Sequence, residues 1–491
     1  MSRSGAEVPP GLTQRTIRGA AWALPTSLAS RLVGLVGTLL LARYLTPSEY
    51  GEVSAAAILV TTASTMTGFG VGIYLVANRD LSRSEAFHAS SWFLATGLAG
   101  TIAVWVLAEP LAAWTDAPHL GRFMPIFVVS VMLERIAFLP ERMLVREMRF
   151  RWLSLARASS ELAYTGVSLC LAALGFGAMA IAWGNLARSV LRFAAIVPAV
   201  GWREWLEPHR LRLATLARIV GHGVTVSLTF IATFAMSRWD NLLVSRYFGP
   251  GTMGAYNYAY NLADAPAQAI GEQMADVVGA SFPHATGPER TAALIHSFTM
   301  ISIVMLPLAF GLGAVAPTVV DTFFSKRWAD VGTMLAFLAA LSATRPLALI
   351  VIAYHYAGHR PRVVLWLEWL SLAAIVAAIS TVGRIGIRWT CASVAVVFVL
   401  RTVAALWTVR RIDGTPISSF LAPLARPLLA CVAMAAAIQL QRPMLVGIPP
   451  ALRLLAEVAL GAAVYLAGAL LVFRAASREL LGQVRAALLH R

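Results

Sequence analysis

The chain has 491 residues, of which 58% are apolar and only 13% are charged, and its mean hydropathy is +0.71. A soluble domain carries about 25% charged residues, so this composition excludes a water-soluble globule. The formal net charge of +16 indicates arginine-rich cytoplasmic loops of a membrane protein rather than nucleic-acid binding. At about 20 residues per helical span plus a short loop, the length accommodates about fourteen spans.

Apolar runs, interrupted by charges, glycines and prolines, predict where these spans lie. The run 252–282 is the least apolar of them, because it contains several amide and carboxylate side chains. The predicted spans are 17–42, 52–77, 88–108, 120–140, 154–175, 178–200, 219–245, 252–282, 292–320, 331–356, 364–382, 389–409, 421–440 and 450–473.

The distribution of basic residues predicts the orientation of the chain. With the N-terminus in the cytoplasm, the loops on that side carry more than twice as many arginines and lysines as the opposite loops. This positive-inside bias places both termini in the cytoplasm. Leucines and arginines alternate at helical spacing after residue 475, which predicts an amphipathic helix at the membrane surface.

Several kinds of chemistry find no support in the sequence. The single lysine, Lys326, follows Ser325 rather than a glycine, which argues against the phosphate-binding loop of an ATP-driven pump. The three cysteines lie far apart in apolar runs, so neither disulfides nor a cysteine-rich metal site is expected. No serine has the nucleophile-elbow context of a hydrolase. We therefore expect no metal, no cofactor and no enzymatic activity.

A short motif occurs twice at equivalent places. Residues 43–51 read Arg-Tyr-Leu-Thr-Pro-Ser-Glu-Tyr-Gly, and residues 246–254 read Arg-Tyr-Phe-Gly-Pro-Gly-Thr-Met-Gly. Each copy lies between the first and second spans of a six-span block, which indicates an internal duplication. Because six is even, both copies enter the membrane in the same orientation, as in transporters built from parallel repeats.

The opening block, from Arg31 through the first motif and on to Gly68-Phe-Gly-Val-Gly, resembles the start of the bacterial polysaccharide flippases. The segment that begins Ser237-Arg-Trp-Asp-Asn, followed by Gly254-Ala-Tyr and Ser281-Phe-Pro, is similar to their second-lobe region. These flippases belong to the multidrug/oligosaccharidyl-lipid/polysaccharide exporter superfamily, and the resemblance spans roughly residues 15–410.

The resemblance implies an all-α polytopic protein of the bacterial cytoplasmic membrane, with two six-helix lobes and two C-terminal helices. Its cargo would be an undecaprenyl-pyrophosphate-linked oligosaccharide, moved from the inner to the outer leaflet. A partnership with a polysaccharide polymerase or synthase is implied by the family alone, and the chain is expected to work as a monomer. The expected regions are a cytoplasmic tail (1–15), an N-lobe (16–200), a cytoplasmic linker (201–218), a C-lobe (219–410), helices 13 and 14 (411–474) and an amphipathic tail (475–491).

Charged side chains inside spans require an explanation, because each costs about 2.5–3.5 kcal/mol at the bilayer centre. Arginine binds phosphate oxygens bidentately, so cationic residues facing a cavity would neutralise a pyrophosphate head group. The alternative is an internal ion pair, such as Arg238 with Asp240 or Arg135 with Glu134, or a side chain that reaches the interface. The candidate substrate-binding residues are Arg31, Arg188, Arg192, Arg238 and Arg345.

A second set of charges suggests ion coupling. Asp264, Gln268, Glu272 and Asp276 follow one another at four-residue spacing along the run 252–282, so they form a polar stripe on one helix face. Carboxylates in such a place exchange protons or bind sodium, although Glu272 and Asp276 also fit a merely solvated cytoplasmic mouth. Asp240 completes the set of candidate coupling residues.

Two other functions remain open on the sequence. A cation-coupled multidrug exporter of the same superfamily would share the fold, but its cationic drugs do not suit a cavity rich in arginine. A polytopic glycosyltransferase or polymerase is disfavoured because no segment between spans exceeds about 20 residues, which leaves little room for an extramembrane catalytic lobe.

Overall fold

The computed structural model describes residues 33–68, 71 and 82–472. Within these residues the chain is almost entirely helical and contains no strand. The N-terminal tail, most of the first predicted span and the predicted amphipathic tail 475–491 lie outside the described residues. The chain divides into two compact units, Met1–Phe234 (unit 1) and Ala235–Arg491 (unit 2).

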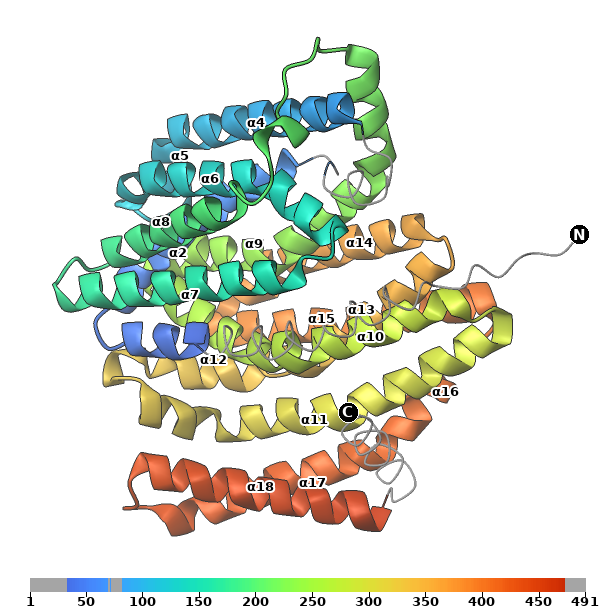
Figure 1. The fold of residues 1–491 in the computed structure, drawn as a ribbon. Helices are drawn as coiled ribbons and strands as arrows, with labels where there is room; N and C mark the ends of the chain where they lie inside the picture. The colour runs from blue at the N-terminus through green and yellow to red at the C-terminus, as the bar shows by residue number, and fades with distance from the viewer. Residues whose placement is uncertain (1–32, 69–70, 72–81, 473–491) are drawn as a thin grey trace, which may run out of the picture. The chain divides into compact units, whose positions relative to one another are not determined.

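Figure 1 shows in blue to green the main helices among the described residues of unit 1. They are α2 (Pro47–Met66), α4 (Arg83–Val106), α5 (Ala108–Thr115), α6 (Leu120–Arg146), α7 (Phe150–Ala173) and α8 (Met179–Ile196). Capping boxes start α2 at Thr46 and Glu49 and α4 at Ser82 and Glu85, where side chains satisfy the free N–H groups of the first turn. Helices α6, α7 and α8 pack against one another.

A long helical segment, α9 (Leu213–Pro266), begins in unit 1 and continues into unit 2. It is interrupted at Gly249, whose φ of 80° and ψ of 169° are not helical. Glycine adopts this left-handed conformation without a Cβ clash, and Pro250 restarts the helix. The residues before and after Gly249 therefore form two helices, as the predicted spans 219–245 and 252–282 require.

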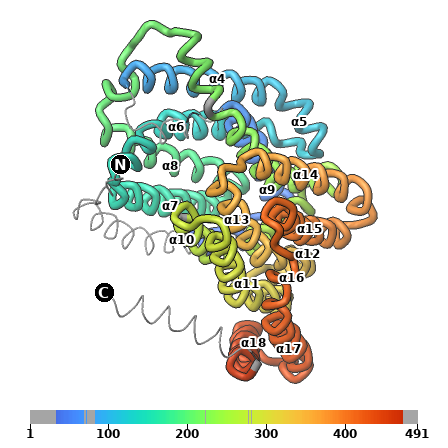
Figure 2. Tube along the Cα trace, turned by 90° about the vertical axis from the view of Figure 1, so that its right-hand side faces the viewer, coloured from blue at the N-terminus to red at the C-terminus, as the bar shows by residue number. Residues whose placement is uncertain are grey.

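The remaining helices belong to unit 2, shown in yellow to red in Figure 1. They are a π-helical turn (Ala267–Gly271), α10 (Glu272–Ser281), α11 (Gly287–Phe323), α12 (Asp330–Leu338), α13 (Leu341–Ala357), α14 (Pro361–Ser380), α15 (Ile387–Asp413), α16 (Ser418–Leu421), α17 (Ala425–Gln441) and α18 (Pro450–Val472). Figure 2 shows α17 and α18 side by side, and both pack against α11.

The C-terminal helices α17 and α18 are attached to α11 by packing and by polar contacts. Gly468 faces Ala430 so closely that a Cβ there would lie 2.9 Å from the alanine Cβ. The Tyr465 hydroxyl donates a hydrogen bond of 2.7 Å to the Ile303 carbonyl on α11. Leucines such as Leu471, which is 76% exposed, cover the outer faces, as lipid contact requires.

Seven helices among the described residues are long and apolar enough to cross a membrane, and two bent helix pairs raise the number to nine. The all-helical, multi-span architecture predicted from composition is thus confirmed. The count of fourteen spans remains a prediction. Helices α7 and α8, with 24 and 18 residues, are not among the helices counted.

Candidate functional site

A cluster of charged residues in unit 1 surrounds Glu141, a carboxylate near the end of α6 whose side chain is only 7% exposed. Arg157 from α7 donates to one of its oxygens at 2.7 Å, and Arg192 from α8 donates to the other at 2.6 Å. Arg142 interacts electrostatically with all three groups. Three guanidinium groups thus surround one carboxylate, so two positive charges are uncompensated within the cluster.

The arginines of this cluster are accessible, unlike the carboxylate they share. The Arg157 side chain is 58% exposed and the Arg192 side chain 29% exposed. The guanidinium of Arg142 stacks on the Phe138 ring at 4.9 Å, and its buried Nε has no hydrogen-bond partner among the described residues. Such an arrangement offers N–H donors and positive charge to an anion, because Glu141 holds the guanidinium groups in position.

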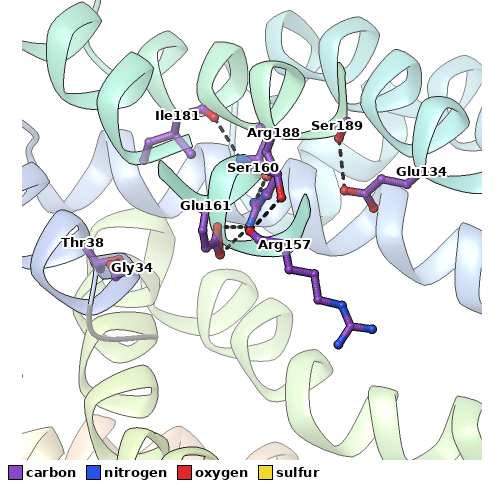
Figure 3. A network of polar contacts seen from close by, with 10 residues as sticks. Gly34, Thr38, Glu134, Arg157, Ser160, Glu161, Ile181, Arg188 and Ser189 are labelled. Atoms are coloured by element: carbon purple, nitrogen blue, oxygen red, sulfur yellow. Dashed lines mark hydrogen bonds and ion pairs between the residues drawn. The ribbon is translucent and has the colours of Figure 1, made fainter. Parts of the chain in front are cut away.

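A second polar group lies one to two turns away along α7 and α8. Figure 3 shows Arg188 of α8 facing Glu161 of α7, with its Nη1 at 3.3 Å from both carboxylate oxygens. The same guanidinium hydrogen-bonds Asn185 and stacks on the Tyr164 ring at 4.5 Å. The cation predicted at position 188 is therefore compensated by a carboxylate, whereas the charge around Arg192 is in excess.

Arg135 has a structural environment. It is 3% exposed and donates to the Ser64 hydroxyl at 3.0 Å, to the Ser64 and Phe93 carbonyls and to the Thr67 hydroxyl. These bonds join α6 to the end of α2 and to α4. The ion pair between Arg135 and Glu134, weighed as an alternative from the sequence, is not among the described contacts; Glu134 instead accepts from Ser189 at 3.1 Å (Figure 3).

In unit 2, a series of hydrogen bonds joins the two helices on either side of Gly249. Tyr256 donates to Asp240 at 2.7 Å, and Asp240 also accepts from the backbone and side-chain nitrogens of Asn241. Asn257 donates to Asn241 at 3.0 Å, and Asn261 donates to Asn257 at 2.7 Å. Asp240 is fully buried, so its charge depends on these donors rather than on water.

The predicted polar stripe continues this series and meets an arginine from α13. Asp264 is 2% exposed and accepts hydrogen bonds from Gln268 and from Arg345. Glu272 also interacts electrostatically with Arg345. The structure thus brings together three of the predicted site residues, and Arg345 is the counter-ion of the stripe rather than an isolated cation.

The helix that carries this stripe has an irregular turn. The π-helical turn Ala267–Gly271 follows Pro266, and π-bulges are frequent at functional sites. Gly271 lies directly against Pro346 of α13, since an added Cβ would be 2.2 Å from the proline Cγ. The Gly271 backbone therefore packs against the Pro346 ring, a contact that leaves no room for a larger residue at position 271. This contact keeps the polar stripe close to Arg345 of α13.

Other predicted residues are not brought into these clusters. Arg238 is partly exposed and interacts electrostatically with Asp240 and Tyr260, but no ion pair is formed with a described residue. Arg31 and the side chain of Asp276 lie outside the described residues. In the described part of the chain, no group of three or more histidine, cysteine, aspartate or glutamate residues could hold a metal ion.

Sequence reasoning did not identify the cluster formed by Glu141, Arg142 and Arg157. The two arginines were counted only as cytoplasmic loop charges, and Glu141 lies just beyond the predicted end of its span. In the structure, helix α6 extends to Arg146. Glu141 and Arg142 therefore belong to the helix and not to the loop.

The long apolar helices of the described residues define a polytopic membrane protein. Residues 40–333 match the family described as "Polysaccharide biosynthesis protein". The chain belongs to this family, as its sequence motifs predict. It is therefore a multi-span membrane protein of a polysaccharide biosynthesis family.

Curated relatives match most of the chain. It is 26% identical over 449 residues to the succinoglycan biosynthesis transport protein ExoT of Rhizobium meliloti (strain 1021), covering 88% of this chain and 87% of the relative. It is 21% identical over 384 residues to the lipopolysaccharide biosynthesis protein WzxC of Escherichia coli (strain K12), covering 77% of each. It is 22% identical over 440 residues to the teichuronic acid biosynthesis protein TuaB of Bacillus subtilis (strain 168), covering 87% and 88%.

Solved structures share the fold. The lipid II flippase MurJ in an inward closed conformation superposes with a TM-score of 0.76 at 16% identity, covering 91% of this chain and 98% of MurJ. An inward-facing multidrug resistance transporter of the MATE family superposes with a TM-score of 0.62 at 15% identity, covering 79% and 98%. These identities are low, so the likeness concerns the fold alone.

Proposed function

We propose that the chain moves an undecaprenyl-pyrophosphate-linked oligosaccharide from the inner to the outer leaflet of the bacterial cytoplasmic membrane, with both termini in the cytoplasm. The observation that carries the proposal is the cluster around Glu141, in which two positive charges are uncompensated and Arg157 is accessible. A pyrophosphate supplies the negative charge that this cluster lacks, and guanidinium groups bind its oxygens bidentately. The family and its relatives in polysaccharide biosynthesis support this class of cargo.

In this proposal Glu141 acts as a resident counter-ion. When no cargo is present, it holds Arg157 and Arg192 at 2.7 and 2.6 Å. The arriving pyrophosphate competes with the carboxylate for the same donors. Arg31, Arg188, Arg238 and Arg345 are proposed as further contacts along the path, while the prenyl tail stays in the lipid.

Ion coupling is proposed for the carboxylates of unit 2. Asp240, Asp264, Glu272 and Asp276 would bind or release protons or sodium as the two units alternate between inward and outward access. The hydrogen-bonded series from Asp240 through Asn257 and Asn261, and the contact between Asp264 and Arg345, support this assignment. A change of charge on Asp264 would alter its attraction for Arg345 and so the packing of α13 on the stripe.

The test measures the lipid-linked sugar pool in a strain that lacks the protein, with an impermeant sugar-modifying enzyme reporting the exposed leaflet. Cells without the protein should accumulate a shielded prenyl-linked oligosaccharide. Complementation with Arg157→Gln or Arg192→Gln should lower the flipping rate about tenfold or more, because a charge-assisted hydrogen bond is worth about 1.5–3 kcal/mol. The control is Arg83→Gln, whose exposed side chain pairs with Glu204 and Glu207.

Normal flipping by both cluster variants would contradict the role of this site. A normal lipid-linked pool in the deletion strain, together with greater drug susceptibility, would instead support the second candidate, a cation-coupled multidrug exporter. That candidate shares the fold, but two uncompensated arginines repel a cationic drug. A partnership with a polymerase or synthase, and function as a monomer, are further proposals that crosslinking in the native membrane would test.

A further inference from the structure

A second cationic site lies in unit 2. Arg246 and Tyr247 come just before the turn at Gly249, and Arg384 lies in the short 3-10 helix Val382–Ile385 that follows α14. Together they line an open hollow of about 460 Å³. Its volume falls within the range of small-molecule pockets, about 300–1,000 Å³.

Tyr247 holds this hollow in a defined geometry. Its hydroxyl donates to Ser380 Oγ at 3.2 Å and accepts from Arg384 Nη2 at 3.2 Å. The guanidinium carbon of Arg384 lies 4.7 Å from the centre of the tyrosine ring, a cation–π distance. Arg384 is thus fixed on the ring by one of its nitrogens, while its remaining N–H groups are available to a ligand.

The positive charge of the site is not balanced within the described part of the chain. Neither Arg246 nor Arg384 forms an ion pair with a described carboxylate. Some arginines of unit 2 do have carboxylate partners: Arg360 binds Asp413 with both terminal nitrogens at 2.8 and 2.9 Å, and Arg453 binds Asp321. Two uncompensated guanidinium groups at one hollow favour a ligand with at least one negative charge.

The internal repeat shows that the turn itself does not require this arrangement. The same Arg-Tyr pair precedes the equivalent turn in unit 1, as Arg43 and Tyr44. There Tyr44 is 52% exposed, and no third basic residue stacks on it among the described residues. Arg384 is therefore an addition specific to unit 2, which a purely structural role of the motif leaves unexplained.

We infer that Arg246, Tyr247 and Arg384 form an anion site that binds the phosphate group of a membrane-embedded lipid. Arg246 and the remaining donors of Arg384 would grip the phosphate oxygens, while the acyl or prenyl chain lies along the apolar helix surface. The positive-inside orientation predicted from the sequence places both arginines in loops opposite the cytoplasm. The phosphate belongs either to a resident phospholipid or to the pyrophosphate of the proposed cargo after it has crossed.

The test uses the purified full-length chain in phosphatidylcholine nanodiscs and counts bound ligand by native mass spectrometry. The probes are phosphatidylglycerol and farnesyl pyrophosphate. The variants are Arg246→Gln and the double variant Arg246→Gln/Arg384→Gln, and Arg327→Gln is the matched control, an arginine of unit 2 that hydrogen-bonds Ser325. Thermal unfolding confirms that each variant is folded. The single variant Arg246→Gln removes no hydrogen bond or ion pair among the described residues, so it keeps the test valid if the double variant is unstable.

We expect the wild-type protein to retain one more tightly bound probe molecule than the arginine variants do. The affinity of the variants for the probe at this site should fall about tenfold or more. If the arginine variants lose bound phosphatidylglycerol, the ligand is a phospholipid. If they lose only farnesyl pyrophosphate, the ligand is the pyrophosphate head group of the proposed cargo. Equal binding of both probes by wild-type and variant protein overturns the inference. Binding is measured without transport, so the outcome of this experiment does not depend on whether the proposed flipping activity is confirmed.

Discussion

The buried ion pair between Glu368 of α14 and Arg401 of α15 gives a sharp prediction about stability. Arg401 Nη2 donates to Glu368 Oε1 at 2.5 Å, and the two side chains are only 3% and 0% exposed. Removal of either partner leaves an uncompensated charge in a medium of low dielectric constant, which costs about 3–5 kcal/mol. The single variants Glu368→Leu and Arg401→Met should therefore both be strongly destabilised.

The double variant Glu368→Leu/Arg401→Met should behave differently. Replacement of a whole buried pair by apolar side chains is often neutral or stabilising, because no charge then has to leave water. We therefore expect the double variant to recover most of the stability lost in the single variants. This non-additivity measures the interaction between the two side chains.

The assay is thermal unfolding of the purified protein in detergent, with apparent midpoints compared across the cycle. At about 2–4 °C per kcal/mol for a unit of this size, each single variant should lose roughly 6–20 °C. The exposed pair of Arg83 and Glu204, at 54% and 52% exposure, is the control; Arg83→Gln should change stability by less than about 1 kcal/mol. Single variants that unfold like the control, or a double variant that loses the sum of the single effects, would refute the reasoning.

Two glycine contacts give further predictions. Gly97→Ala should destabilise unit 1 by several kcal/mol, because the new Cβ would lie 1.8 Å from Nη1 of Arg135. This is about the cost of overpacking a core or of breaking a buried hydrogen-bond network. Thermal unfolding measures the loss, and an unchanged midpoint would show that Arg135 moves aside freely. Gly271→Ala should impair transport, since its Cβ would be 2.2 Å from Pro346 Cγ and would separate the polar stripe from α13. The flipping assay measures this effect, with Gly121→Ala as control because that position has open space around it; equal rates for the two variants would rule out a requirement for the close contact.

Which charges pair with which depends on helices that are distant in the sequence. Glu368 is recognisable as an intramembrane carboxylate, but its partner Arg401 comes from the next helix, 33 residues away. Arg345 and Asp264 are separated by 81 residues. Both residues were identified individually as candidates, yet no spacing rule joins them, because the contact between α13 and the polar stripe is made by packing.

The sequence by itself determined the class of the protein. Its composition excludes a soluble globule, because burial in lipid is the only way to satisfy so many apolar side chains, and the same argument requires internally hydrogen-bonded helices. The Arg-Tyr motif predicts a duplication, and the regular spacing of Asp264, Gln268 and Glu272 indicates a polar helix face. These features are local or periodic, so they can be read along one chain.

Only the tertiary structure decided which charges are compensated. In the structure, Arg157 and Arg192 both bind Glu141, whereas Arg188 pairs with Glu161. Arg135 is buried and donates to backbone carbonyls, and Arg384 stacks on Tyr247. Electrostatic interactions fall off with distance and depend on burial, and both quantities are properties of the packed helices. The net charge available to a ligand is therefore fixed by the fold, although every charged residue is visible in the sequence.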